Sequence, residues 1–264
     1  MNRIIVHNIQ PEIDISCFDL PGSDPIAAPL LLLHGLGADA ATTYAHIASS
    51  PSLSPSRRIL VDLAGFGKSH APDSWSATIE EHASLIAVLL DRLLLRPGVV
   101  VGHSLGGSIA ISLATQRPDL VSRLIVAEPN LDPNSGTFSG QITRFTERAF
   151  LERGHSMIVR ALHLEERRNP GSQPSFAETV AAADPRVLHR TAVSLREPRS
   201  FSFRNQLETL SIPKRFIAGE DCIENLTLRN NPYRIDLITI AEAGHVMMHD
   251  DPDAFVRAVS GFLR

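Results

Sequence analysis

The pentapeptide Gly102-His103-Ser104-Leu105-Gly106 constrains this chain more than any other feature of its sequence. It has the pattern G-x-S-x-G, follows an apolar run and precedes a stretch that is typical of a helix. A sharp turn from a strand into a helix lifts a serine hydroxyl off the sheet edge, and the two glycines leave room that side chains would fill. The pattern therefore predicts that Ser104 is a nucleophile, rather than a capping residue in a glycine-rich turn.

Short apolar runs alternate with helical stretches along much of the chain. Strands are expected at 30–33, 58–63, 99–101, 124–127, 214–219 and 237–241. Runs that are apolar throughout and end at glycine are typical of parallel strands buried on both faces. The spacing of apolar residues predicts helices at 79–95, 108–116 and 252–263. This alternation of strand and helix predicts a parallel sheet with right-handed crossovers.

The pattern changes after about residue 129, where strand-like runs give way to candidate helices separated by glycine and proline. One of these helices, at 141–153, is expected to carry four apolar side chains on one face: Ile142, Phe145, Ala149 and Phe150. Strand-like runs return near residue 214. We therefore expect a core that is interrupted by a helical insertion, with the divisions 1–129, 130–210 and 211–264.

A serine hydroxyl becomes a good nucleophile only when a base takes its proton. Among eleven histidines, His245 lies in the segment AEAGH, between the last expected strand and the last expected helix. Parallel strands end at a common edge of a sheet, so His245 is expected close to Ser104. His249 follows four residues later, but the segment HVMMH lacks the glutamate of the zinc motif H-E-x-x-H. Neither a metal nor a cofactor is predicted.

Two backbone N–H groups are candidates for stabilising a negatively charged oxygen beside Ser104. One belongs to Leu36, in the segment HGLG after the first parallel strand, and the other to Leu105, at the start of the helix. His34 is expected to hold the HGLG loop, and Asp62 to bind amides of the turn that follows its strand.

The composition argues against several classes of partner. The 264 residues carry a net charge of −4 without a block of like charges, which does not predict a nucleic-acid groove or a polybasic membrane patch. The first ten residues lack the unbroken apolar stretch of a signal peptide, and no apolar run approaches the ~20 residues that span a bilayer. Cys17 and Cys222 are too few for a disulfide framework. We expect a cytoplasmic protein, and leave open whether it is a monomer or a homodimer.

Taken in chain order, the segments HGLG, VDLAGFGKS, GHSLGG and AGH resemble the α/β-hydrolase family, over nearly the whole chain from Leu30 to Arg264. The resemblance implies an α/β fold: a mostly parallel sheet of about eight strands, helices on both faces, and a helical cap inserted after the sixth strand. It also implies a catalytic triad in the order serine, acid, histidine that works without a cofactor. The serine at position 104 argues against the haloalkane dehalogenase and epoxide hydrolase chemistry of relatives that carry an aspartate there.

The acid of the implied triad has two candidates. In the usual pattern of the family it is the aspartate of G-x-x-Asp after strand seven, but residues 219–222 read GEDC, so Cys222 stands at that position. Haloalkane dehalogenases and zearalenone-lactonase-like enzymes carry the acid after strand six, where this chain has Glu128. We favour Glu128 over Asp221 as the residue that orients His245. The alternative role of Glu128 is to cap the first turn of the insertion.

The insertion is rich in phenylalanine. Six of the eleven phenylalanines lie between 131 and 203, namely Phe138, Phe145, Phe150, Phe176, Phe201 and Phe203. They suit an apolar acyl chain or ring, although packing of the cap is the simpler explanation for each one. The resemblance thus implies a serine hydrolase for a carboxylic ester or lactone of a moderately apolar small molecule. Perhydrolysis, carbon–carbon bond cleavage and a non-catalytic ligand receptor remain the alternatives, because fold and triad do not fix the substrate.

Overall fold

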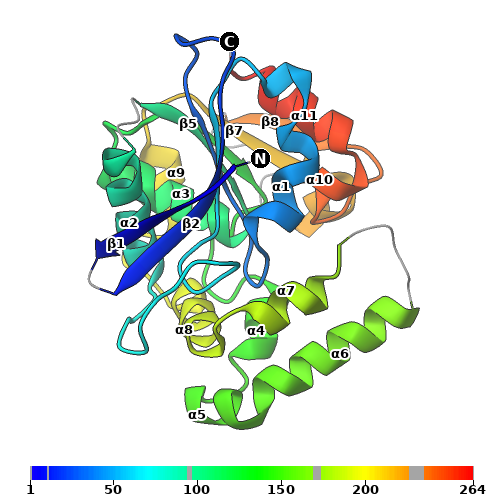
Figure 1. Ribbon diagram of the computed structural model, residues 1–264. Coiled ribbons are helices and arrows are strands. Elements are labelled where there is room, and N and C mark those ends of the chain that lie inside the picture. Colours follow the sequence, from blue (N-terminus) through cyan, green and yellow to red (C-terminus); the bar gives the residue numbers. More distant parts are fainter. Residues whose placement is uncertain (1, 11, 94–96, 169–173, 226–234, 264) are drawn as a thin grey trace.

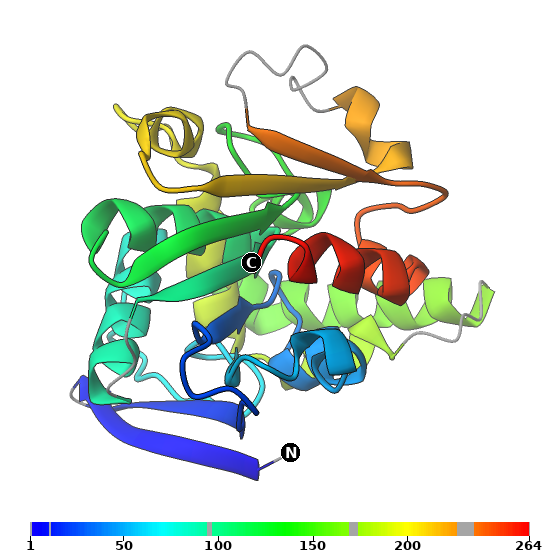
Figure 2. The same ribbon diagram turned by 90° about the horizontal axis from the view of Figure 1, so that it is seen from above.

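The computed structural model describes residues 2–10, 12–93, 97–168, 174–225 and 235–263. Its centre is an eight-stranded sheet in the order β1-β2-β4-β3-β5-β6-β7-β8. The strands are β1 (Asn2–Gln10), β2 (Ile13–Leu20), β3 (Leu30–Leu33), β4 (Arg58–Val61), β5 (Gly98–His103), β6 (Val121–Ala127), β7 (Lys214–Gly219) and β8 (Asp236–Ile240). β2 pairs antiparallel with β1 and β4, and all other neighbours are parallel. Figure 2 shows β1 and β8 at opposite ends of the sheet.

Helices cover both faces of the sheet (Figure 1). On one face lie α2 (Ile79–Arg92), α3 (Leu105–Gln116) and α9 (Phe203–Thr209). On the other lie α1 (Ala40–Ala48), α10 (Met247–Asp250) and α11 (Pro252–Ser260). The fold class predicted from the sequence, a mostly parallel α/β sheet with helices on both faces, is confirmed.

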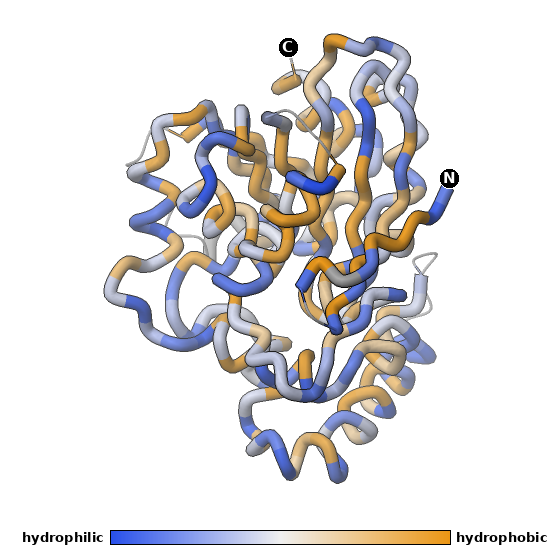
Figure 3. Tube along the Cα trace, turned by 60° about the vertical axis from the view of Figure 1, so that its left-hand side comes forward, coloured by the Kyte–Doolittle hydropathy of each residue, from blue (hydrophilic) through white to orange (hydrophobic). Residues whose placement is uncertain are grey.

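The buried apolar residues form two clusters, one on each face of the sheet. The central strands supply both clusters because their alternate side chains point to opposite faces. In β3, for example, Leu31 and Leu33 belong to one cluster and Leu30 and Leu32 to the other. All four leucines are at most 3% exposed. Figure 3 shows this apolar interior along the strands, with hydrophilic residues concentrated on the outside. Apolar burial on both faces is therefore what fixes the central strands.

Helices fill the interval between β6 and β7, which we call the cap segment (residues 130–210). It contains α4 (Thr137–Ile142), α5 (Glu147–Ala149), a π-helix (Phe150–Gly154), α6 (His155–Arg168), α7 (Phe176–Ala182), α8 (Pro185–Arg196) and α9. Figure 1 shows α4 to α8 beyond one end of the sheet, whereas α9 packs beside α3. Apolar residues of the cap segment, such as Phe150 and Val187, belong to the same cluster as residues of α3. The cap segment and the core therefore share one hydrophobic interior.

The continuous helix predicted at 141–153 is wrong. α4 ends at Ile142, and the next helix begins after Thr146, whose hydroxyl accepts a hydrogen bond from the backbone N–H of Ala149 at 3.3 Å. Between them the carbonyl of Phe145 bonds to the ring of His189 on α8, at 2.9 Å. A capping threonine and a tertiary contact therefore override the apolar periodicity of this stretch. Among the described residues, no helix is long and apolar enough to span a membrane.

Candidate active site

The sharp turn after β5 carries Ser104. Its φ of 51° and ψ of −117° lie outside the regions that ordinary residues prefer. The turn is held by the N–H of Ser104, which donates to the carbonyl of Ala127 on β6 at 2.9 Å. A Cβ atom on Gly102 would overlap the carbonyl of Gly106, and one on Gly106 would overlap the carbonyl of Leu33. Both glycines are thus required by the close approach of β3, β5 and α3.

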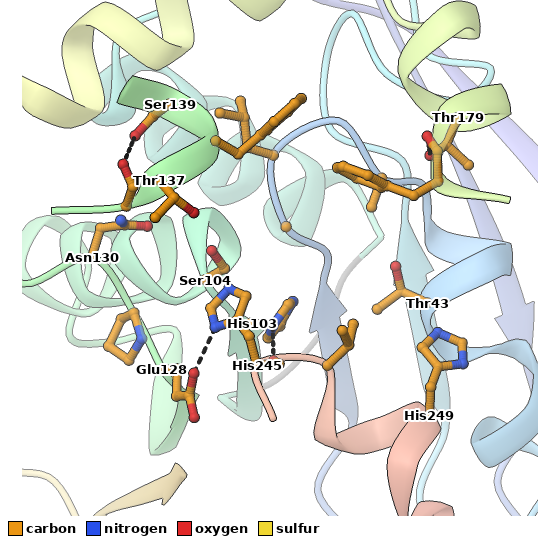
Figure 4. Close-up of a pocket in the computed structure, with 18 of the residues that line it drawn as sticks. Thr43, His103, Ser104, Glu128, Asn130, Thr137, Ser139, Thr179, His245 and His249 are labelled. Atoms are coloured by element: carbon orange, nitrogen blue, oxygen red, sulfur yellow. Dashed lines mark hydrogen bonds and ion pairs between the residues drawn. The ribbon is translucent and has the colours of Figure 1, made fainter. Parts of the chain in front are cut away.

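His245 lies between an acid and Ser104. Its Nδ1 is 2.6 Å from Oε2 of Glu128. A carboxylate only accepts, so Nδ1–H donates and the neutral ring has a free lone pair on Nε2. Figure 4 shows the ring between the Glu128 carboxylate and Ser104, which places that lone pair on the side of the serine. This arrangement of hydroxyl, imidazole and carboxylate can take the serine proton as the oxygen attacks.

Glu128 is fixed by the sheet. It follows β6 with φ 45°, and its residue is 6% exposed. Its Oε1 accepts the backbone N–H of Gly219, at the end of β7, at 2.8 Å. Both carboxylate oxygens are therefore engaged, one by the backbone and one by His245, which determines the direction of the carboxylate.

Asp221, the alternative acid, is exposed, and among the described residues no hydrogen bond or ion pair joins its side chain to His245. Its backbone N–H donates to the carbonyl of Ala243 at 3.1 Å. The neighbouring Cys222 lies beside Glu128. Burial raises the pKa of its thiol to about 11, and the charge of Glu128 together with a hydrogen bond to that carboxylate contribute to the rise. The thiol consequently stays protonated at neutral pH.

The two candidate oxyanion donors belong to α3 and to the loop after β3. Leu105 begins α3, where the first N–H groups have no partner inside the helix. Leu36 belongs to the loop between β3 and α1 and lines the cavity above Ser104. Within the described part of the chain, no hydrogen bond uses the N–H of either residue. Both groups are available to a developing negative charge, in the pattern of an oxyanion hole.

The loop with Leu36 is held as the sequence suggested. His34 is fully buried; its Nδ1 bonds to the carbonyl of Gly35 at 2.8 Å, and its Nε2 accepts the N–H of Leu63 at 3.0 Å. Burial lowers the pKa of His34, so the neutral ring joins the two loops. Asp62 accepts the N–H groups of Ala40 and Lys68, each at 3.0 Å. Both residues therefore act on loop conformation.

A cavity of about 590 Å³ opens above Ser104. Its walls include residues of the loops after β3, β5, β6 and β8 and of α1, α4 and α7. Phe138 and Phe176 contribute an aromatic pair, with ring centroids 5.1 Å apart. The other four phenylalanines of the cap segment are not among its described lining residues. Neither lysine nor arginine occurs in that described lining. The cavity has the size of a small-molecule site.

A sequence profile of the alpha/beta hydrolase family matches residues 30–258 of the chain. The chain belongs to this family. The family resemblance predicted from the HGLG, GHSLGG and AGH segments is thereby confirmed.

Individual members of the family are similar over most of their length. The chain is 27% identical to the sn-1-specific diacylglycerol lipase ABHD11 of Mus musculus, over 93% of this chain and 84% of the lipase. A solved thermophilic esterase from Thermogutta terrifontis has a TM-score of 0.79 and 24% identity, covering 100% of this chain and 98% of the esterase. The N-acyl homoserine lactonase AidH, solved as an E219G mutant with N-hexanoyl homoserine, has a TM-score of 0.76 and 20% identity, covering 100% and 96%. These structural likenesses concern the fold.

One residue beside the candidate site escaped the sequence analysis. His103, next to the nucleophile position, bonds through Nε2 to the backbone carbonyl of His245 at 2.8 Å. Burial, followed by the charge of His245, lowers the pKa of His103 to about 3. It therefore stays neutral and positions the loop that carries His245. No sequence motif distinguishes His103 from the other ten histidines, except that it adjoins Ser104.

The described residues contain no group of three histidine, cysteine, aspartate or glutamate side chains that could hold a metal ion. His249 lines the same cavity as His245, and its ring stacks on that of His46, with centroids 4.6 Å apart. Burial lowers the pKa of His249, and the adjacent His46 lowers it further. The two histidine rings of HVMMH thus have different partners, Glu128 for His245 and His46 for His249.

Proposed function

We propose that this alpha/beta hydrolase is a serine hydrolase that cleaves a carboxylic ester or lactone of a moderately apolar small molecule through an acyl-enzyme. The observation that carries the proposal is the His245 ring, bonded to the buried Glu128 carboxylate and directed at Ser104 under a cavity of about 590 Å³. The names of the similar lipase, esterase and lactonase support the same class of bond.

In the proposed mechanism Ser104 Oγ attacks the carbonyl carbon while Nε2 of His245 takes its proton. Glu128 keeps the ring in the required tautomer and stabilises the imidazolium that forms. The N–H groups of Leu36 and Leu105 stabilise the oxyanion. The imidazolium then protonates the leaving alcohol, and a water activated by His245 hydrolyses the acyl-enzyme. No cofactor takes part in these steps.

We propose further that the cap segment, 130–210, forms the lid of the substrate cavity, with 1–129 and 211–264 as the two parts of the core. Phe138 and Thr179 support this assignment, since they belong to α4 and α7 and line the cavity. A lid that contains an aromatic pair suits the apolar part of an acyl or alkyl group.

A panel of p-nitrophenyl esters and lactones of increasing chain length tests the proposal. We expect turnover by the wild-type chain and a loss of at least about 10⁴-fold in kcat for Ser104→Ala. Product analysis by mass spectrometry should find the free acid and alcohol. A folded protein that binds members of the panel without turning any of them over would support the receptor alternative and overturn this proposal.

A further inference from the structure

Most hydroxyl groups around the cavity already donate a hydrogen bond to another group of the protein. Apart from Ser104, seven serine and threonine side chains are among the described lining residues, namely Thr42, Thr43, Ser135, Thr137, Ser139, Ser175 and Thr179. A hydroxyl has one proton to donate and two lone pairs with which to accept. Where the proton goes therefore determines what the hydroxyl offers to a ligand.

Three of these hydroxyls donate to backbone carbonyls and are almost fully buried. Thr43 Oγ1 donates to the carbonyl of Asp39 at 2.7 Å, Thr179 Oγ1 to that of Phe176 at 2.9 Å, and Ser139 Oγ to that of Gly136 at 3.2 Å. The three residues are 4%, 8% and 2% exposed. A carbonyl oxygen can only accept, so the proton of each hydroxyl is committed to it. Thr43, Thr179 and Ser139 thus present only lone pairs to the cavity.

Three more hydroxyls follow the same rule. Thr42 donates to the carboxylate of Asp39 at 2.9 Å, Ser175 to that of Glu166 at 2.8 Å, and Ser135 to the carbonyl of Asp132 at 2.6 Å. Thr137, which is exposed, is the one member of the described set without such a partner. Ser175 Oγ also accepts the N–H of Glu178 at 3.2 Å. All the described lining hydroxyls except those of Ser104 and Thr137 can therefore act toward a ligand only as hydrogen-bond acceptors.

Asn130 adds an acceptor that has no partner at all. Its amide nitrogen lies 3.4 Å from Ser135 Oγ, and because that hydroxyl has donated to Asp132, the Asn130 amide must be the donor in this contact. The direction of the amide is thereby fixed, and its Oδ1 is left buried without a hydrogen bond. A buried acceptor of this kind costs free energy until a donor reaches it.

The acceptors lie on both sides of the nucleophile. Figure 4 shows Thr43 and Thr179 on one side of Ser104, and Asn130 and Ser139 on the other. The described lining has no lysine or arginine whose charge could neutralise an anionic ligand. Two backbone donors near Ser104, the N–H groups of Leu36 and Leu105, are used in the proposed mechanism for the scissile carbonyl.

We propose that the substrate is an ester or lactone that carries its own hydrogen-bond donors, hydroxyl or N–H groups, close to the scissile bond. The inference rests on the proposed function and specifies its substrate. Such groups satisfy the lone pairs of Thr43, Thr179 and Ser139, whereas ether, ester or carboxylate oxygens at the same positions face lone pairs and lose the hydration they had in water. The proposed substrate is therefore a hydroxylated or amide-bearing ester, and not a half-ester of a dicarboxylic acid.

Matched pairs of esters that differ by one methyl cap test the inference. Hydroxyethyl and methoxyethyl butanoate place the donor on the alcohol side, and methyl β-hydroxyhexanoate and methyl β-methoxyhexanoate place it on the acyl side. Acetamidoethyl butanoate and its N-methyl analogue replace O–H by N–H. We expect at least one donor to exceed its capped partner by about tenfold or more in kcat/KM, after correction for the rates of hydroxide hydrolysis. The pair that responds identifies the side and the kind of donor.

The variants Thr43→Val and Ser139→Ala remove acceptors from opposite sides of Ser104. In one of them the ratio of kcat/KM between donor and capped ester should fall severalfold. The matched control is Thr115→Val on α3, because Thr115 makes the same bond to the carbonyl four residues earlier, at 3.0 Å, but is exposed and does not line the cavity. This control should leave the ratio unchanged, and thermal melts verify that each variant folds.

The outcomes separate this inference from the proposed function. If p-nitrophenyl butanoate is hydrolysed and every capped ester is turned over as fast as its donor partner, the inference is wrong and the hydrolase proposal stands. Turnover of p-nitrophenyl butanoate without turnover of any donor ester has the same meaning. If no ester is hydrolysed by the folded protein, both proposals fail.

Discussion

At the residue scale, the backbone itself is strained where the proposed chemistry takes place. Ser104 and Glu128 both have positive φ values, 51° and 45°, and each directly follows a strand, β5 or β6. Such conformations cost about 1–3 kcal/mol each and persist only where the surroundings impose them. Neighbouring parallel strands hold both residues: the N–H of Ser104 bonds to Ala127 and that of Glu128 to Ile217. The side chains of both residues thus lie beside His245, at the ends of two adjacent strands.

The exchange of Glu128 for Gln tests the identity of the acid. The Gln side chain can still accept the N–H of Gly219, so the fold should be retained. Its amide cannot act as an anionic acceptor for Nδ1–H of His245, and the preferred tautomer is lost. We expect kcat on an ester to fall by about 10⁴-fold for Glu128→Gln and to stay near the wild-type value for Asp221→Asn. Steady-state kinetics giving the reverse order would move the acid to Asp221.

At the scale of elements, the loop between β3 and α1 is packed directly against the cap segment. Gly37 in this loop has a φ of 79°. A Cβ atom on it would lie 2.8 Å from Val180 Cγ2, 3.1 Å from a ring carbon of Phe138 and 3.3 Å from one of Phe176. The loop that holds the Leu36 N–H is thus in contact with α4 and α7. The position of the cap segment and the geometry of the proposed oxyanion hole are consequently linked.

Replacement of Gly37 by alanine should disturb that link. The left-handed backbone costs an alanine about 1–2 kcal/mol, and the added methyl must displace Val180 or the loop. We expect a lower melting temperature and a kcat reduced by about tenfold or more through displacement of the Leu36 N–H. Gly140→Ala is the control, because Gly140 lies in α4 and the nearest atoms to its Cβ are the far end of Arg196. Equal kinetics for both variants would show that the loop does not depend on this contact.

At the scale of the whole molecule, buried histidines couple stability to pH. His82 is 1% exposed and packs its ring edge on Trp75, with centroids 4.6 Å apart. Burial lowers the pKa of His82 from 6.5 to about 3, and the pKa of His103 falls similarly. Between pH 6.5 and about pH 3 these histidines bind protons in the unfolded chain but not in the folded chain. The stabilisation is present above pH 6.5 and is lost as the pH falls toward 3.

The variant His82→Gln should reduce this acid sensitivity. Thr191 Oγ1 donates to the carbonyl of Ala77, so His82 Nε2–H is the donor to Thr191 at 3.1 Å, and a Gln amide retains a donor there. We expect the free energy of unfolding to fall less between pH 7 and pH 5 in His82→Gln than in wild type. Urea titrations at both pH values measure it, with His70→Gln as a control because His70 is exposed. If His82→Gln loses as much free energy of unfolding between pH 7 and pH 5 as wild type, His82 is not a source of the acid sensitivity.

The sequence was most informative for segments whose apolar pattern fits only one kind of secondary structure. The central strands were predicted to within a few residues, since runs such as Leu30 to Leu33 are buried on both faces. β1 and β2 were not placed, because β1 is largely exposed and β2 mixes apolar with polar residues. In the cap segment, local caps and contacts such as the Phe145–His189 bond decided where helices end.

For the candidate site, motifs located the residues that follow the strands but not those that the surrounding helices bring. Ser104, His245 and Glu128 are adjacent because they follow β5, β8 and β6 at one sheet edge, which strand order predicts. Thr43 and Thr179 come from α1 and α7, and their hydroxyl directions depend on tertiary packing. No spacing in the sequence encodes that packing.

Covalent labelling by a fluorophosphonate tests the central claim most directly, because the probe reacts with a serine whose hydroxyl is activated and open to the cavity. Intact-mass spectrometry of the wild-type chain should show a single adduct, and peptide mapping should locate it on Ser104. The adduct should be absent in Ser104→Ala and strongly slowed in Glu128→Gln. An unlabelled wild-type chain with intact fold, or an adduct that persists in Ser104→Ala, would contradict the assignment of Ser104 as the nucleophile.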